Sequence, residues 1–290
     1  MIVWEQQTWR DLEEAHHARV DAASGGHLQR RRRGASHPVE DFLWVYYRYR
    51  PAQLRRWHPG PGVGLADAVS SDRPTWRYYR SLGSIVTLDV EAFVAARGDA
   101  LRYVVDLLSA IAARPAGYGC FGLHEWAMVY GADETRHGWP LRLGAAGTDE
   151  VVRSRPLRCT HYDAFRFFTP QAATRNEHRP TLQLRSQLEQ PGCVHAGMDC
   201  YKWAFTLAPG ISSGLTMDCF DHARRAREVD MRASPYDLRD LGYEPIAVET
   251  PAGRAQYVQE QQALARTAAG LRSRLVQAAR TLLDAARLVA

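Results

Sequence analysis

The segment 194–208 is almost entirely apolar except for one narrow polar stripe. At about 100° per residue, its polar side chains fall within a sector of roughly 60° on a helix; they are His195, Asp199, Lys202 and Thr206. Apolar side chains cover the remaining surface, so the pattern predicts a buried helix. Because a buried charge is costly unless it is paired, we expect the stripe to face other polar groups or a ligand.

Other parts of the chain also show a regular spacing of apolar residues. The spacing predicts further helices over 4–23, 90–113, 123–130, 212–232 and 252–288. It predicts a short strand at 84–89 and two more within 139–168, which mixes Pro, Gly and β-branched residues. No internal repeat or Pro/Ser-rich linker divides the sequence. We therefore predict a mainly α protein with a minor β element: an N-terminal helix and basic loop over 1–36, then a single helical domain over 37–290.

The composition narrows the class of protein. A chain of 290 residues with 46% hydrophobic residues can bury a large core. Its five cysteines form no CxxC pair, which is typical of reduced thiols in a cytosolic protein. The first residues lack the pattern of a signal peptide, and no run of ~18 apolar residues occurs, so we expect no membrane span. The sequence thus predicts a cytoplasmic protein and leaves its oligomeric state open.

Arginine accounts for nearly all of the basic residues, since Lys202 is the only lysine. The formal net charge of +5 is compatible with an anionic partner such as nucleic acid. Basic and aromatic residues that suit phosphate contacts and base stacking gather near the N-terminus; they are Arg30, Arg31, Arg32, Arg33, Arg55, Arg56 and Trp57. The alternative is a solvated arginine-rich surface. No GK[ST] phosphate loop is present, which disfavours nucleoside-triphosphate hydrolysis.

Three histidines each have a carboxylate close by in the sequence, in apolar and aromatic surroundings. The pairs are His124 with Glu125, His161 with Asp163, and His195 with Asp199. The three imidazoles could bind a transition metal, with the acids orienting them. The same groups could instead form an acid–base cluster, or simply be hydrogen-bonded core residues. Because the spacing matches neither HExxH nor the ExxH of ferritin-like helices, the sequence leaves these alternatives open.

Several longer motifs are spread over nearly the whole chain. They are His37-Pro-Val-Glu-Asp-Phe42, Tyr49-Arg-Pro-Ala-Gln-Leu-Arg-Arg-Trp-His-Pro-Gly-Pro-Gly62, Cys120-Phe-Gly-Leu-His-Glu-Trp-Ala-Met-Val-Tyr130, Arg158-Cys-Thr-His161, Gln190-Pro-Gly-Cys193, Met198-Asp199, Tyr201-Lys-Trp-Ala204 and Asp230-Met-Arg-Ala-Ser-Pro-Tyr-Asp-Leu238. In these motifs the chain resembles a family of actinobacterial proteins commonly labelled 3-methyladenine DNA glycosylase. The sequence lacks the helix-hairpin-helix glycine hairpin and following catalytic Asp of the best-known superfamily of such enzymes.

The resemblance implies the removal of alkylated purines from DNA without a cofactor. Such a base is cationic and leaves readily, so the enzyme must flip it, stack it and stabilise an oxocarbenium-like sugar with a carboxylate. The candidate catalytic residues are Asp199, Glu125, Asp163, His195 and, in a Schiff-base variant, Lys202. The candidate base-binding residues are Trp126, Tyr162, Tyr201, Trp203, His124 and His161.

Two other functions remain open at this point. The first is a metal-dependent enzyme that acts on a small molecule and uses His124, His161 and His195. The second is a non-catalytic nucleic-acid-binding protein, whose DNA affinity would depend on salt and survive removal of the buried acids. Bound metal in the purified protein would favour the first alternative.

Overall fold

The chain forms two compact units, each assembled from separate stretches of sequence. The computed structural model describes residues 1–133, 135 and 137–287. Unit 1 comprises residues 1–106, 200–221 and 271–290, and unit 2 comprises residues 107–199 and 222–270. The chain passes from one unit to the other four times, each time within a helix. These four helices are α4 (Val90–Ala112), α10 (Val194–Thr206), α11 (Ser213–Arg232) and α12 (Pro251–Arg287).

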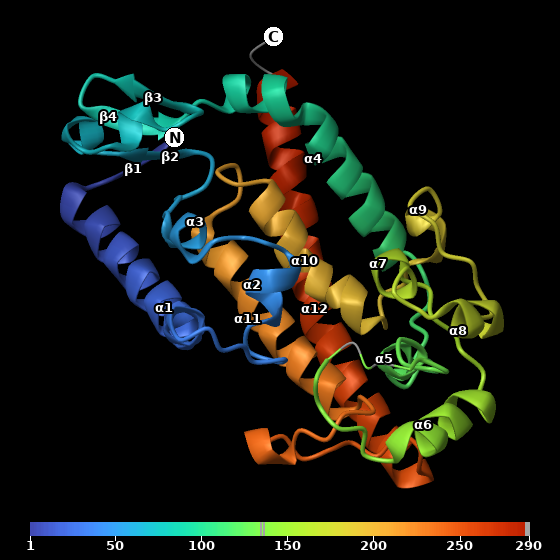
Figure 1. The fold of residues 1–290 in the computed structure, drawn as a ribbon. Coiled ribbons are helices and arrows are strands. Elements are labelled where there is room, and N and C mark those ends of the chain that lie inside the picture. Colours follow the sequence, from blue (N-terminus) through green and yellow to red (C-terminus); the bar gives the residue numbers. More distant parts are fainter. Residues whose placement is uncertain (134, 136, 288–290) are drawn as a thin grey trace. The chain divides into compact units, whose positions relative to one another are not determined.

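Unit 1 contains a small four-stranded sheet in the order β1-β2-β4-β3 (Figure 1). The strands are β1 (Ile2–Trp4), β2 (Val63–Leu65), β3 (Tyr79–Leu82) and β4 (Ile85–Leu88). β1 runs parallel to β2, whereas β4 is antiparallel to both β2 and β3. A two-residue turn joins β3 to β4, and Gly83 adopts a φ of 61° there, which glycine does without strain. β4 confirms the strand predicted at 84–89.

Unit 1 also contains α1 (Gln6–Arg32), α2 (Phe42–Tyr46), α3 (Pro51–Arg55) and two 3₁₀ turns at Ala68–Ser70 and Arg73–Thr75. The basic loop predicted before residue 36 is wrong, because α1 continues through Arg32. Gly25 and Gly26 lie within α1. A glycine in the interior of a helix lowers the stability of the helix by about 1 kcal/mol. Contacts near the C-terminal end of α1 offset this cost: His27 stacks on Trp44, and Arg30 donates three hydrogen bonds to the Asp41 carboxylate.

Within its described residues, unit 2 contains five short helices: α5 (Leu123–Ala127), α6 (Gly144–Arg153), α7 (Tyr162–Phe165), α8 (Pro170–Arg175) and α9 (Arg185–Leu188). A 3₁₀ turn follows at Arg239–Leu241. The two strands predicted within 139–168 are wrong. Among the described residues of that stretch, only Leu141 and Leu157 make isolated β-bridges. The β-branched Val151 and Val152 lie instead on the buried face of α6, so burial overrides their preference for strands.

The longest helix, α12, begins at a polar cap. Thr250 caps α12 by accepting a hydrogen bond from the Gly253 N–H at 3.0 Å, and Pro251 occupies the first turn. α4, α10, α11 and α12 confirm the helices predicted over 90–113, 194–208, 212–232 and 252–288. The fold is thus mainly α with one small sheet, as predicted. No helix within the described part of the chain is long and apolar enough to cross a membrane.

Two glycines of α12 should respond in opposite ways to alanine. A Cβ at Gly253 would overlap the Ala247 carbonyl group, whereas nothing lies within 4 Å of a Cβ at Gly270. We expect Gly253→Ala to lower the free energy of unfolding by about 1–3 kcal/mol. Gly270→Ala should raise it by about 0.5–1 kcal/mol, since alanine is the better helix former. Urea unfolding of both variants measures the difference; equal effects would contradict this packing of α12 against residue 247.

Candidate metal centre

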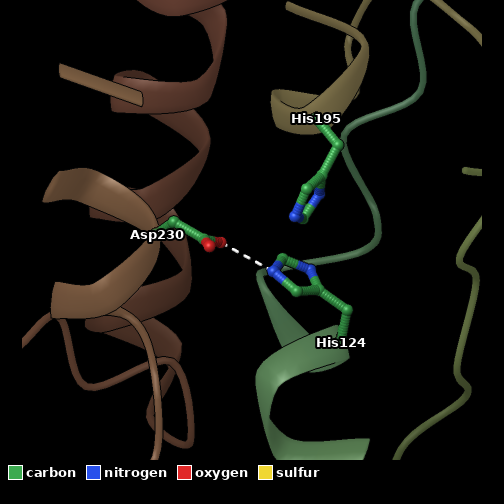
Figure 2. A group of neighbouring side chains, drawn as sticks. All are labelled: His124, His195 and Asp230. Atoms are coloured by element: carbon green, nitrogen blue, oxygen red, sulfur yellow. Dashed lines mark ion pairs between the residues drawn. The ribbon is translucent and has the colours of Figure 1, made fainter. Parts of the chain in front are cut away.

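Three potential metal ligands of unit 2, each on a different helix, converge. They are His124 on α5, His195 on α10 and Asp230 on α11. One ligand atom from each lies within 4.8 Å of the other two. Figure 2 shows the three side chains pointing toward one another. The two imidazole rings meet edge to face, with centroids 4.4 Å apart.

The contact between His124 and Asp230 is close but is not a hydrogen bond. His124 Nε2 lies 2.7 Å from Asp230 Oδ1, yet each of these buried atoms lacks a hydrogen-bond partner among the described residues. The pair is therefore near in distance and poorly aligned in direction. Buried polar atoms are normally satisfied, so the exception requires an explanation. A cation bound to both atoms would satisfy them without requiring an aligned N–H.

An ion pair behind the three ligands fixes the carboxylate of Asp230. Arg227 Nη1 donates to Asp230 Oδ2 at 3.1 Å and to Glu125 Oε1 at 2.6 Å. All three side chains are buried, with Asp230 fully inaccessible. Because Arg227 holds Oδ2, Asp230 presents Oδ1 to the histidines. Glu125, predicted as a catalytic carboxylate, is therefore linked to Asp230 through Arg227 and is not one of the three convergent residues.

Burial and neighbouring charges shift the protonation of all three ligands. Burial lowers the pKa of His124, but the adjacent Asp230 raises it above its ordinary value. Burial favours a higher pKa for Asp230, but the charge of His124 outweighs this and lowers it. Burial, together with the nearby His124, holds the pKa of His195 well below its usual range. His195 is thus neutral at pH 7, the form in which imidazole binds a metal.

A second buried ionic network adjoins the first. Arg185 donates to Glu189 Oε1 at 2.7 Å and to Asp199 Oδ2 at 2.8 Å. His161 Nε2 lies 3.4 Å from Asp199 Oδ2, and the His161 ring stacks on His195 with centroids 5.4 Å apart. His161 therefore belongs to this second network. Asp230, rather than His161, completes the set of ligands around His124 and His195.

A pocket in unit 2 opens onto the two ligand histidines. The space within it, about 430 Å³, includes volume that is open to solvent. Its lining includes His124 and His195. Three of the five cysteines also line it, namely Cys120, Cys159 and Cys193. The apolar and aromatic side chains of the lining are Leu123, Leu157, Phe168, Val194 and Tyr257. Burial raises the pKa of all three thiols, so they are protonated and poor nucleophiles. The pocket thus reaches two of the three convergent residues, since Asp230 does not line it.

The structure separates the predicted catalytic carboxylates from this pocket. Asp199 is buried beside Arg185 and does not line it. Asp163, partly buried, lies 3.3 Å from Arg166. Lys202 belongs to unit 1, where its ammonium group lies 4.9 Å from the centre of the Trp203 ring. Of the five predicted catalytic residues, only His195 therefore lines the pocket.

The aromatic residues predicted to stack on a base also lie outside the pocket lining. Trp126 is fully buried and donates its indole N–H to the Ala233 carbonyl at 2.9 Å. Tyr162 is half-buried at the start of α7. Tyr201 and Trp203 are buried in unit 1. The aromatic residues of the pocket are instead Phe168 and Tyr257.

The predicted nucleic-acid-binding residues in unit 1 differ in exposure. Five of them are exposed to solvent: Arg31, Arg32, Arg33, Arg55 and Arg56. Arg30 is partly buried in its ion pair with Asp41. Trp57 is buried, with the guanidinium group of Arg73 4.9 Å from the centre of its ring. Trp57 is thus covered. Of the exposed arginines, Arg55 forms an ion pair with Asp21, and the guanidinium group of Arg56 lies 4.9 Å from the centre of the Trp76 ring.

The sequence prediction missed Asp230 and the arginines that organise the two networks. A signal was present in α11, where Ala223, Ala226, Arg227 and Asp230 follow the i, i+3, i+4, i+7 spacing of one helix face. All four are buried, so two charged residues occupy positions typical of a core stripe. Charges at such positions indicate a buried polar network.

In comparisons with known proteins, the chain matches no protein-family model, no curated protein and no solved structure.

Proposed function

We propose that this protein is a metal-dependent enzyme that acts on a small molecule. The observation that carries the proposal is the convergence of two imidazoles and one carboxylate beside a pocket. Two nitrogen donors and one oxygen donor suit zinc, and the same set occurs in non-haem iron(II) sites. The ligands come from three separate helices and are held by packing, which favours a preformed site.

The chemistry follows from the number of protein ligands. Three ligands leave coordination positions for water and substrate, as in catalytic rather than structural zinc sites. A bound divalent ion lowers the pKa of its water and polarises a substrate oxygen. The mostly apolar lining of the pocket would keep bulk water from competing at the ion.

The charge balance of the site supports a cation at this position. The carboxylates of Glu125 and Asp230 share one guanidinium nitrogen of Arg227, which leaves negative charge in a buried place. Protonation of His124 can balance that charge in the metal-free protein, as its raised pKa indicates. A divalent ion bound to Asp230 would replace the proton.

Metal analysis tests the proposal. The protein should be purified without chelators, stripped, and reloaded separately with zinc, iron(II) and cobalt(II). We expect about one ion per chain, and a visible cobalt spectrum that changes when azide enters an open coordination position. Turnover of small ester and amide substrates should require the ion. A folded protein that takes up none of the three ions would overturn the proposal.

Glu125→Gln tests the supporting ion pair. Glutamine cannot balance the charge of Arg227, so Arg227 should pull Asp230 away from the histidines. We expect metal affinity, measured by competition with a chelating dye, to fall about 10- to 100-fold. Glu150→Gln on α6 is the control, because Glu150 is exposed and pairs with Arg153. Equal affinities of both variants would show that Asp230 needs no support from this pair.

A DNA glycosylase is the second candidate. The exposed arginines of α1 and α3 favour it, since they suit contacts with phosphates. Its test is the release of methylated purines from alkylated DNA by the wild type and by Asp199→Asn, assayed by mass spectrometry. Release by the wild type alone would place Asp199 in or beside the site.

A further inference from the structure

We propose that the pocket binds a small monocarboxylate with an apolar body, and that Arg158 binds the carboxylate while the substrate approaches His124 and His195. This inference rests on the proposed metal-dependent function. Three features of the pocket indicate the class of substrate: the charge of its lining, its apolar walls and one buried hydroxyl.

The described residues of the pocket lining include one arginine and no acidic side chain. Arg158 is the only Arg, Lys, Asp or Glu among the described residues that line it. A divalent ion at the histidines would add a second positive centre. An anionic substrate is therefore attracted to the pocket, and no lining carboxylate repels it. One guanidinium group can bind one carboxylate through two parallel hydrogen bonds.

Arg158 is available for such a contact. Its Nε atom lies 3.0 Å from Glu177 Oε2, and both side chains are more than half exposed. Exposed ion pairs contribute little stability, so this one yields readily to a better ligand. No further ion pair or hydrogen bond of the Arg158 side chain occurs among the described residues. Its two terminal nitrogens can form a bidentate contact with a carboxylate.

The walls of the pocket select an apolar body. Leu123, Leu157, Phe168 and Val194 contribute apolar surface. Apolar side chains combined with a few polar groups are typical of the lining of sites for small molecules. The buried walls favour transfer of a hydrocarbon or aromatic group from water.

A buried hydroxyl supplies a further polar contact. Tyr257 lines the pocket and is fully buried, but its hydroxyl has no hydrogen-bond partner among the described residues. An unsatisfied buried hydroxyl costs about 1–3 kcal/mol, which a ligand oxygen would remove by accepting its hydrogen bond. The orphaned hydroxyl thus points to a ligand independently of Arg158.

Hydrogen bonds preorganise the loops at the pocket. The Gln190 side chain accepts a hydrogen bond from the Gly117 N–H at 2.9 Å and donates one to the Gly117 carbonyl at 3.1 Å. Gln261 donates to the Gly192 carbonyl at 2.7 Å. These contacts hold the segments that carry Cys120 and Cys193, so little loop ordering is required when a ligand enters.

The test compares acids with neutral alcohols of the same shape. Binding of benzoate, butyrate and 3-phenylpropionate to the zinc-loaded protein is measured by calorimetry, beside benzyl alcohol, butanol and 3-phenylpropanol. We expect at least one acid to bind more tightly than its alcohol. Arg158→Gln should weaken that acid about 10- to 100-fold and leave the alcohol unchanged, because only the charged contact is lost. Arg153→Gln is the control, since Arg153 is similarly exposed and lies outside the pocket lining.

The outcomes separate this inference from the proposed function. Tight metal binding without any preference for the acids, or with equal loss of acid and alcohol in Arg158→Gln, overturns the inference and leaves the metal centre intact. Arg158-dependent binding of an acid to a protein that takes up no metal supports the pocket and refutes the metal-dependent function. The metal content of each sample must therefore be measured in parallel.

Discussion

His195→Ala is expected to abolish stoichiometric metal binding, with a loss of affinity of at least about 100-fold. This exceeds the usual effect of losing an outer-shell contact, because one of three protein ligands disappears. His195 is neutral at pH 7 and half-buried beside His124, so its removal leaves two ligands. Elemental analysis and a cobalt(II) titration of the variant measure the loss.

His178→Ala is the matched control for that experiment. His178 also belongs to unit 2 but lies outside the convergent set of His124, His195 and Asp230. Circular dichroism must show that both variants fold. If His195→Ala retains one tightly bound ion per chain while His178→Ala loses it, the assigned ligand set is incorrect.

Arg185→Met is expected to lower the free energy of unfolding by about 3–5 kcal/mol, measured by urea unfolding. The reason is that the variant leaves Glu189 and Asp199, both buried, without the guanidinium group that bonds to each of them. Burial alone lowers the pKa of Arg185, but these carboxylates raise it above its ordinary value, which reflects the strength of the pairing.

A compensated variant separates charge from packing in this network. Adding Glu189→Gln and Asp199→Asn to Arg185→Met removes the unbalanced charges and should recover part of the lost stability. Arg153→Met, at an exposed position of α6, should change the free energy of unfolding by less than about 1 kcal/mol. A cost below about 1 kcal/mol for Arg185→Met would show that water already reaches these carboxylates.

The sequence was most informative where one helix face carries a consistent pattern. The apolar surface and polar stripe of 194–208 predicted the buried helix α10, and the stripe does place His195 and Asp199 among other charged groups. The strand at 84–89 was predictable because a glycine turn and β-branched residues agree locally. The full length of α1 was not predictable. The helix continues through Gly25 and Gly26 because its C-terminal part contacts Trp44 and Asp41, which lie later in the sequence.

Two of the three residues of the candidate site were predictable from the sequence. His124 and His195 stood out as histidines in apolar surroundings. Asp230 did not, since its partners are 106 and 35 positions away in the sequence and meet it only after the helices pack. His161 lies near the same histidines but pairs with Asp199 and Glu189. Only tertiary structure distinguishes these two roles.

The fourfold passage of the chain between the two units has a practical consequence for dissecting the protein. Neither unit corresponds to one continuous stretch, so no single truncation isolates the metal ligands with their surroundings. A fragment that ends at residue 199 cuts α10 immediately after Asp199 and omits Asp230. Minimal versions of the site would therefore have to be built by rewiring loops or by grafting the three ligands onto another scaffold.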